Sequence, residues 1–580
     1  MIDRSDWQRS LKESISSENL RRHLEWLSKV RRDTGGPGEK KTAEYLAAEL
    51  KSHGVQYRLH EFDAFLSYPI RATLEVLEPE HITIRALTHS FGRSTGPVGV
   101  IASLRYLPDG NMNHGAGRAA MVDGLLSPIK VLDATRAGVS ALIFANDEWY
   151  IHNMIGTTIW GTPTISQLDR LPDIPVISIN HEGGQTLRRL LQEGPVTVKV
   201  TTEVNTGWFP SLLPEAIIPG TQEPEKFVLV GGHYCAWEVG ITDNATGNAC
   251  LLEIARVLNQ HREHLTRSVR VAWWPGHSHG RYSGSTWYAD NFWEDMARNC
   301  IVYHNIDSPG VRGATQYVVR QTTAEVERFG QEMITLITGQ TNSPKHRPSR
   351  AADQSFLATG VPSFSCYPFL PEDHPDRKPW TGGSAMGWWW HTEHDTLNKA
   401  DIDILTTDTR LSCTAVAELC QCTVLPMDFE AVAREVTAVL ADLAEAAQGH
   451  LDFGRLLEKV PALSAATAAL AKVQAVLSKE GGDKARVSRL NRVLMRLSRI
   501  LTPVIYSSGG RFTHDPADMT PIMRAGTKSL FPTLSKAAGL PALSGKHEYG
   551  FLRTEVRREM NRVGDALDQA VEVIENAIGN

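Results

Sequence analysis

The sequence predicts an α/β protein in which helices flank a mixed sheet, with an inserted β-rich domain and a C-terminal helical domain. Three observations predict this class: strand and helix patterns alternate over 226–425, strand-like segments dominate from about 56 to 205, and only amphipathic helical patterns follow Pro426. The expected division of the chain is 1–75 and 206–425 for the core, 76–205 for the insertion and 426–580 for the helical domain.

Two helices are expected between residues 15 and 53. Ser17 can cap the first, in which Leu20, Leu24 and Leu27 recur at helical spacing. The run GGPGEKK separates the two helices, because glycine and proline disfavour a continuous helix. The second helix is expected from about Glu39 onward.

The stretch from about 56 to 205 reads as a small β-rich module with its own core. Segments typical of strands are separated by turn signals, and one helix is expected at SPIKVLDATRAG. The strand-like segments are TLEVLEP, VGVIASLRYL, ALIFAND and IPVISIN.

The core pattern begins with KFVLVGGHY, a buried strand that runs into a glycine-rich turn. A helix at NATGNACLLEIARVLNQH and strands at SVRVAWWPG and NCIVYHNID follow. Polar residues come directly after each strand. Because ligands of open α/β sheets bind at the carboxyl ends of the strands, we expect these side chains to converge.

Beyond Pro426 the strand pattern stops and four amphipathic helices are expected. Their apolar stripes predict a helical bundle or an oligomerisation domain. The four segments are 428–447, 453–479, 485–502 and 549–577.

Composition narrows the class of protein. The 580 residues (64.1 kDa) suffice for three or four domains. The net charge is −6, and the 60 basic and 66 acidic residues are well mixed along the sequence. This charge distribution argues against nucleic-acid and anionic membrane partners. Seven cysteines, an odd number, argue against a disulfide framework. The N-terminal residues lack the apolar stretch of a signal peptide, and no uninterrupted apolar run approaches the ~20 residues of a membrane span. We therefore expect a soluble cytoplasmic protein.

Five short segments place potential metal ligands at a strand end or a helix start. Imidazoles and carboxylates bind borderline or hard divalent cations; zinc is the usual ion at mixed sites, and iron or manganese would also suit. One histidine at a strand end is more often structural, but five such segments around one sheet predict a metal site. The segments are GGHYC (231–235), TDNATG (242–247), HSHG (277–280), NID (305–307) and HTEHDT (391–396).

These segments resemble those of the di-zinc aminopeptidase family, which also contains glutamate carboxypeptidase II, the transferrin receptor and glutaminyl cyclase. GGHYC and TDNATG are similar to its H-x-D and D-N-A-S-G, HSHGRYSGS occupies the place of its G-A-E-E-x-G-L-x-G-S, NIDSPG resembles N-x-D-M-x-G, and WHTEHDT resembles Y-H-T-x-x-D-T. The likeness is strongest over 206–425. Residues 75–200 resemble the family's protease-associated domain, and the C-terminal helices resemble its dimerisation domain, which implies a homodimer.

The resemblance implies roles for four residues. His233 and Asp307 would bind one metal, Asp243 would bridge two metals, and His391 would bind the second. A carboxylate between two cations holds them roughly 3.5–4 Å apart, where they act on one substrate together. Asp243 could instead be a plain helix N-cap, but capping explains none of its neighbours.

The departures from the family fall on the catalytic positions. Its paired glutamates, a general base and a metal ligand, are replaced by His277 and Ser278, with His279 next. Cys235 stands where the family has the Asp that orients the metal-bound imidazole, and Trp390 stands where it has a Tyr that donates a hydrogen bond.

Three interpretations follow. In the first, the enzyme is a rewired hydrolase in which one of His277 and His279 binds metal and the other is the general base; alternate residues of extended backbone point the same way, so both could face the site. In the second, one metal serves a lyase, deaminase, cyclase or amidase reaction. In the third, the site is inactive and the protein binds a partner, as the transferrin receptor does. The retained ligands favour an enzyme, and we favour hydrolysis of an amide-type C–N bond in a small molecule or peptide.

Two further sets of residues are candidates for substrate contact. Asp353 and Gln354 lie in RAADQSFLATGVPSF, which resembles the family's S-D-H-x-x-F segment beside the substrate pocket, although a helix start would explain them equally. The run Trp388 to Trp390 beside His391 could wall an apolar pocket, although large aromatic residues are more often core.

Overall fold

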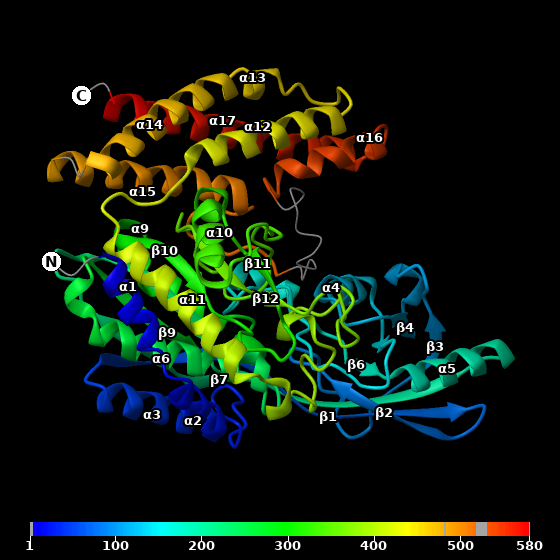
Figure 1. Cartoon of the computed structure of the whole chain (residues 1–580). Helices are drawn as coiled ribbons and strands as arrows, with labels where there is room; N and C mark the ends of the chain where they lie inside the picture. Colours follow the sequence, from blue (N-terminus) through cyan, green and yellow to red (C-terminus); the bar gives the residue numbers. More distant parts are fainter. Residues whose placement is uncertain (1–3, 481–482, 518–529, 579–580) are drawn as a thin grey trace.

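Within the residues described, 4–480, 483–517 and 530–578, the computed structural model has one twelve-stranded sheet that runs through the core and the insertion (Figure 1). The strand order is β1-β2-β6-β5-β4-β3-β7-β9-β8-β10-β12-β11. The strands are β1 (Gln56–Glu78), β2 (Ile82–Thr88), β3 (Val100–Tyr106), β4 (Ala119–Asp123), β5 (Ala141–Ala145), β6 (Val176–Ile179), β7 (Thr197–Ile218), β8 (Glu223–His233), β9 (Arg267–Trp274), β10 (Cys300–Asn305), β11 (Gln316–Arg320) and β12 (Ser363–Phe369).

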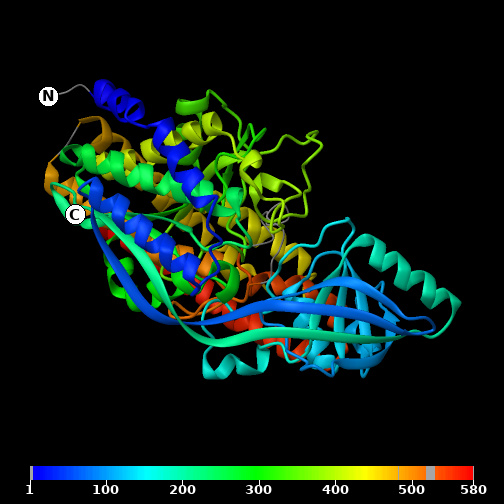
Figure 2. The same ribbon diagram turned by 90° about the horizontal axis from the view of Figure 1, so that it is seen from below.

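Two long antiparallel strands, β1 and β7, join the core to the insertion, as Figure 2 shows. At one end of β7, Val200 pairs with Val100 of β3; at the other end, Ala216 pairs with Val271 of β9. The insertion and the core therefore share one continuous sheet, and the domain boundaries expected from the sequence stay a prediction.

The core half of the sheet is mixed, as predicted. β8 is parallel to β9 and β10, and β10 is parallel to β12, whereas β7–β9 and β11–β12 are antiparallel. Parallel neighbours end at the same edge of a sheet, so the residues that follow β8, β9 and β10 are brought together there.

Helices cover both faces of this half-sheet, which explains why its strands are apolar throughout. Successive side chains alternate between faces: Val228 and Val230 of β8 pack into one buried cluster, and Phe227 and Leu229 into another. The first face is covered by α3 (Pro37–Ser52), α6 (Thr246–Gln260) and α11 (Ile402–Gln421), and the second by α8 (Ser283–Asn291) and α9 (Trp293–Asn299).

The two N-terminal helices are present as α2 (Ser17–Leu27) and α3, and α1 (Arg4–Glu13), which the sequence pattern did not predict, precedes them. The predicted cap residue was wrong by one position. Ser16, not Ser17, is the N-cap: its side chain accepts the backbone N–H of Asn19 at 3.1 Å.

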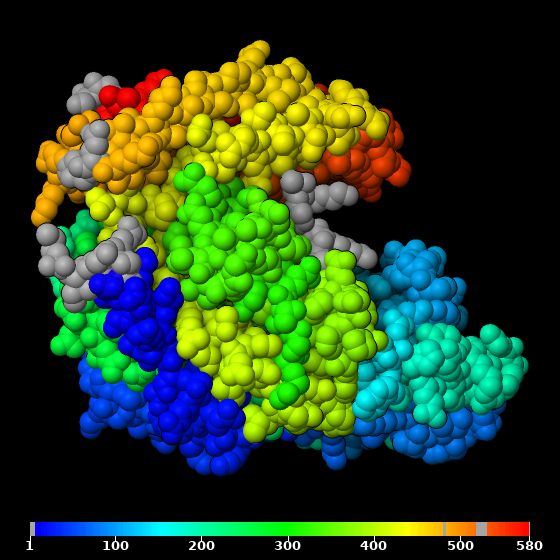
Figure 3. Space-filling view, in the orientation of Figure 1, coloured from blue at the N-terminus to red at the C-terminus, as the bar shows by residue number. Residues whose placement is uncertain are grey.

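The insertion has apolar clusters of its own, with α4 (Pro128–Ala137) and α5 (His181–Glu193) packed on its strands. Ile143, Ile177 and Leu187 share one cluster, and Val131 and Phe144 belong to another. In the space-filling view the insertion is a lobe beside the core (Figure 3). Its likeness to a protease-associated domain stays a prediction.

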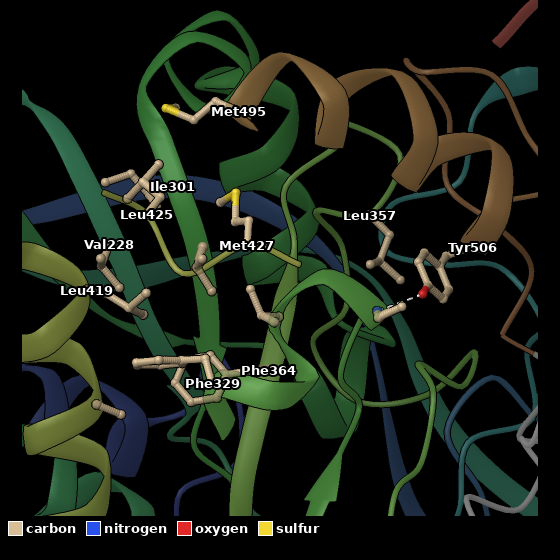
Figure 4. Packing of buried hydrophobic residues seen from close by; sticks show 14 of the residues in the cluster. Val228, Ile301, Phe329, Leu357, Phe364, Leu419, Leu425, Met427, Met495 and Tyr506 are labelled. Atoms are coloured by element: carbon tan, nitrogen blue, oxygen red, sulfur yellow. Dashed lines mark hydrogen bonds between the residues drawn. The ribbon is translucent and has the colours of Figure 1, made fainter. Parts of the chain in front are cut away.

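The C-terminal helices fall close to the four predicted segments, as α12 (Phe429–Ala446), α14 (Val460–Glu480), α15 (Lys484–Tyr506) and α17 (Glu548–Ile578). They continue the core: Met495 and Tyr506 of α15 share the buried cluster of Ile301 on β10 (Figure 4). Much of the apolar stripe of α17 is buried within the chain, so it does not by itself argue for a dimer. The other helices are α7 (His277–Gly280), α10 (Ala324–Thr338), α13 (Gly454–Leu457) and α16 (Leu540–Leu543).

Among the described residues, one helical stretch, Gly454–Lys479, has the length and apolar character of a membrane span. A third of its most apolar window is buried against the rest of the chain. A single helix of this kind is weak support for a membrane span, because core helices share these properties.

Candidate metal centre

The four residues that the resemblance implied as ligands meet at the carboxyl edge of the parallel strands. His233 is the last residue of β8, and Asp307 follows the end of β10 by two positions. Asp243 lies in the turn ahead of α6, and His391 lies in a loop before α11. All four side chains are buried.

Asp243 lies between the two histidines. Its Oδ1 is 2.9 Å from His233 Nε2, and its Oδ2 is 3.2 Å from His391 Nε2. Asp307 Oδ1 lies 3.7 Å from the same His233 nitrogen. Ligand atoms of His233, Asp243 and Asp307 lie within 4.8 Å of one another. One carboxylate thus faces two imidazoles, which is the arrangement that a bridging metal ligand requires.

Main-chain carbonyls fix the orientation of both rings. His233 Nδ1 is 2.8 Å from the carbonyl oxygen of Cys235, and His391 Nδ1 is 2.8 Å from that of Asn153. Because a carbonyl only accepts, each Nδ1 carries a proton, and each Nε2 is directed towards Asp243, where it can bind a cation or a second proton. His391 does so from a left-handed backbone with φ of 57°, a conformation that costs about 1–3 kcal/mol in a non-glycine residue.

This donor set fits a divalent cation. His233 Nε2 is buried and makes no hydrogen bond to any described residue, although Asp243 is near. Lone pairs and two carboxylates that face one another in a buried site repel unless a positive charge lies among them. Mixed nitrogen and oxygen donors suit zinc, with iron and manganese as other occupants.

The electrostatics of the group point the same way. Burial alone would lower the pKa of His233, but Asp243 and Asp307 outweigh it and raise that pKa well above its ordinary value. Burial would raise the pKa of Asp243, but His233 and His391 hold it well below its ordinary value. The site therefore stabilises a buried anionic carboxylate only with positive charge beside it.

Hydrogen bonds hold the Asp243 turn in place. The Asp395 carboxylate accepts the backbone N–H groups of Thr242 at 2.9 Å and of Asp243 at 3.0 Å. The Asn244 amide donates to the carbonyl of Ile306 at 3.0 Å. Asp243 is not the cap of α6, because it lies three residues ahead of Thr246, where that helix begins, and its carboxylate faces the imidazoles.

His277 reaches the same site from the end of β9. Its ring stacks on that of His233 with centroids 3.9 Å apart, and it lines the cavity that contains Asp243, Asp307 and His391. Its Nδ1 is 2.9 Å from Asp353 Oδ2. The sequence prediction that Asp353 contacts substrate is corrected: Asp353 does not line the cavity and instead binds the far side of His277.

His279 does not join the site, so its predicted roles as ligand and as base are corrected. Residues 277–280 form the helical turn α7, not extended backbone, so the side chains two residues apart diverge. Gly276 starts the turn with φ of 69°. The His279 ring packs on Trp237 with centroids 4.4 Å apart, and burial lowers the pKa of His279 to about 4.

Three other predicted residues differ in their relation to the cavity. The main-chain carbonyl of Cys235 orients His233, while the thiol lies 3.9 Å from the Ser278 hydroxyl. Trp390 lines the cavity and stacks on His391 with ring centroids 3.8 Å apart. Gln354 is buried and does not line the cavity.

The cavity has a volume of about 560 Å³, and the insertion forms part of its wall. The two other tryptophans of the 388–390 run do not line it. Sequence reasoning missed the wall residue His152 and the carbonyl of Asn153, which are far in sequence from the core motifs. Nothing in their local pattern marks them. The lining from the insertion comprises residues 124–127, 146–148, 152, 154 and 155.

Comparison with known sequences gives matches that agree with this geometry. The family model described as Peptidase family M28 matches residues 216–416. A probable glutamate carboxypeptidase of Zea mays is 24% identical over 341 residues, which cover 47% of each chain. A probable leucine aminopeptidase 2 of Aspergillus oryzae is 23% identical over 66% of this chain and 79% of its own length. The chain thus spans about half the length of the maize relative.

Solved structures share the fold. An aminopeptidase from Aneurinibacillus sp. strain AM-1 superposes with a TM-score of 0.57 at 21% identity, over 71% of this chain and 96% of its own. A peptidase M28 precursor from Shewanella amazonensis gives a TM-score of 0.59 at 16% identity, over 72% of this chain and 97% of its own. At such identities the likeness establishes the fold alone.

Proposed function

We propose that this chain, whose residues 216–416 match the model of Peptidase family M28, is a metal-dependent hydrolase with an altered active site, acting on an amide-type C–N bond of a small molecule or peptide. The observation that carries the proposal is the buried Asp243 carboxylate between two imidazoles whose Nε2 atoms face it. His233, Asp243, Asp307 and His391 would hold one or two zinc ions. When bound, the metal would polarise the scissile carbonyl and lower the pKa of a water molecule.

His277 is the residue that we assign as general base. It lines the cavity next to the ligands, and its Nδ1 is engaged by Asp353, which leaves Nε2 to accept a proton. In this role the imidazole replaces the glutamate of the family, and Ser278 leaves the second metal position without that family's carboxylate.

The missing carboxylate favours a second candidate function. With Ser278 in place of a glutamate, the group of potential ligands within 4.8 Å among the described residues is His233, Asp243 and Asp307, which would bind a single ion. A one-metal enzyme of another class, such as a lyase, deaminase, cyclase or amidase, would use the same cavity. A receptor-like protein without activity is the third candidate. Such a protein would need neither the fixed orientation of the His233 and His391 rings nor a histidine such as His277 in the cavity wall.

The cavity wall restricts the substrate. Apolar side chains such as Leu126, Met154 and Trp390 line much of it, and the insertion closes one side. A volume of about 560 Å³ suits a small molecule or the end of a peptide, not a folded protein.

We further propose a homodimer in the cytoplasm with no nucleic-acid or membrane partner.

Elemental analysis of the purified full-length protein after zinc, iron or manganese supplementation tests the metal. One equivalent would favour the one-metal enzyme, two the di-metal hydrolase, and none the receptor-like protein. A panel of aminoacyl p-nitroanilides, dipeptides and N-acyl amino acids, followed by mass spectrometry, tests hydrolysis. Failure of the metal-loaded protein to cleave any C–N bond would contradict the hydrolase.

A further inference from the structure

A chain of buried hydrogen bonds runs from the insertion to His277. The indole N–H of Trp160 donates to Ser355 Oγ at 2.8 Å, and Ser355 Oγ lies 2.9 Å from Ser285 Oγ. The Ser285 hydroxyl donates to Asp353 Oδ1 at 2.8 Å, and Asp353 Oδ2 is 2.9 Å from His277 Nδ1. The first four side chains are at most 6% exposed, so water does not compete for these bonds.

The chemistry of the two ends fixes the direction of every bond in this chain. An indole N–H can only donate, and an ionised carboxylate can only accept. Ser285 has one hydroxyl hydrogen and donates it to Asp353, so Ser285 must accept from Ser355, whose oxygen in turn accepts the indole N–H of Trp160. The other acceptor for Ser285, the carbonyl of Tyr282, is farther away at 3.3 Å.

We infer that Asp353 is a positioning residue that holds His277 with its proton on Nδ1 and so presents the Nε2 lone pair to the cavity. Among the described residues, the second oxygen of Asp353 accepts only from His277 Nδ1–H, and stacking on His233 fixes the plane of the ring. The use of that lone pair as a base rests on the proposed function, whereas the tautomer does not. Through Trp160 the insertion supports this histidine in addition to forming part of the cavity wall.

The Asp353→Asn variant tests the inference without a change of shape. Ser285 still donates, so the Asn amide must turn its oxygen to Ser285 and its NH₂ group to His277 Nδ1. Nδ1 then has to accept, and the proton moves to Nε2. We expect two-bond ¹H–¹⁵N spectra of the full-length, metal-free protein, labelled with ¹⁵N at histidine, to show this move of the proton from Nδ1 to Nε2. The His277 signal is assigned as the one that disappears in the His277→Gln variant.

A double variant and a matched control sharpen the test. Adding Ser285→Ala to Asp353→Asn removes the donor, frees the amide to turn its oxygen to His277, and is expected to restore part of the Nδ1–H signal. Ser283→Ala makes the same substitution on α8, at a hydroxyl that bonds no described residue, and should leave the tautomer unchanged. If Asp353→Asn fails to fold, the wild-type spectrum still decides: an Nε2–H tautomer there overturns the inference.

Turnover of the metal-loaded enzyme separates this inference from the proposed function. Asp353→Asn should lower kcat at least tenfold, while KM and metal content change less than twofold. A wild-type tautomer retained in Asp353→Asn would overturn the positioning role, whatever the turnover. The expected tautomer switch in a protein that hydrolyses no amide would overturn the proposed function and leave the positioning role intact.

Discussion

His277 and His279 lie two residues apart in one turn, yet they have different surroundings. His277 stacks on a ligand histidine, lines the cavity and bonds a buried carboxylate. His279 packs between aromatic rings, and its nearest carboxylate, that of Asp33, is 3.6 Å away. The backbone turn, and not the residue type, therefore decides which imidazole can act in chemistry.

The largest effect is expected from Asp243→Asn, against which the metal content and activity of the variants of both histidines can be compared. Asn keeps the shape but removes the charge that faces His233 and His391, so the bound metal should fall below a tenth of an equivalent. Elemental analysis and the amide panel measure this. The control is Asp373→Asn, which makes the same change at an exposed aspartate that does not line the cavity. This variant should keep the bound metal and the activity.

His277→Gln should lower kcat about 10²–10⁴-fold with the metal retained, because a general base contributes that much. Metal content, measured on the same sample as turnover, distinguishes the two roles that the sequence left open. A parallel loss of metal and activity would show that His277 is a ligand, and full activity would remove it from the mechanism.

The contrast between these histidines also shows how far sequence reasoning reaches. The convergence of His233, Asp243 and Asp307 was predictable, because parallel strands end at one edge and apolar runs mark those strands. The turn that separates His277 from His279 was not, because four residues are too few to show a helical period.

Contacts between residues far apart in the chain could also not be predicted from the sequence. Asn153 orients His391 through a main-chain carbonyl, which any residue could supply. Trp160 reaches Ser355 across 195 positions through one N–H. Hydrogen bonds of this kind leave no pattern in the amino-acid sequence, whereas the apolar stripes of α15 and α17 do, and those helices were predicted within a few residues.

His279→Ala should act on stability and not on chemistry. Removing a buried ring that packs on Trp237 and Tyr68 leaves a cavity, and the free energy of unfolding should fall by about 2–4 kcal/mol. Denaturant titration measures the loss. The folded enzyme should keep its metal and its kcat within twofold, and a hundredfold loss of kcat would reinstate His279 as a catalytic residue.

The smallest effect is a pH dependence of stability that His279 contributes. Its pKa falls from 6.5 to about 4 on burial, so between these values the unfolded chain binds a proton that the folded protein excludes. The contribution of His279 is complete above pH 6.5 and is lost as the pH falls towards 4. His279→Leu should therefore flatten the decline of unfolding free energy over this window relative to wild type. The decline should persist in part, because burial also lowers the pKa of His89 and His304. An unchanged slope in His279→Leu would mean that this imidazole is protonated in the fold, with the Asp33 carboxylate as its counter-charge, and that burial does not keep His279 neutral.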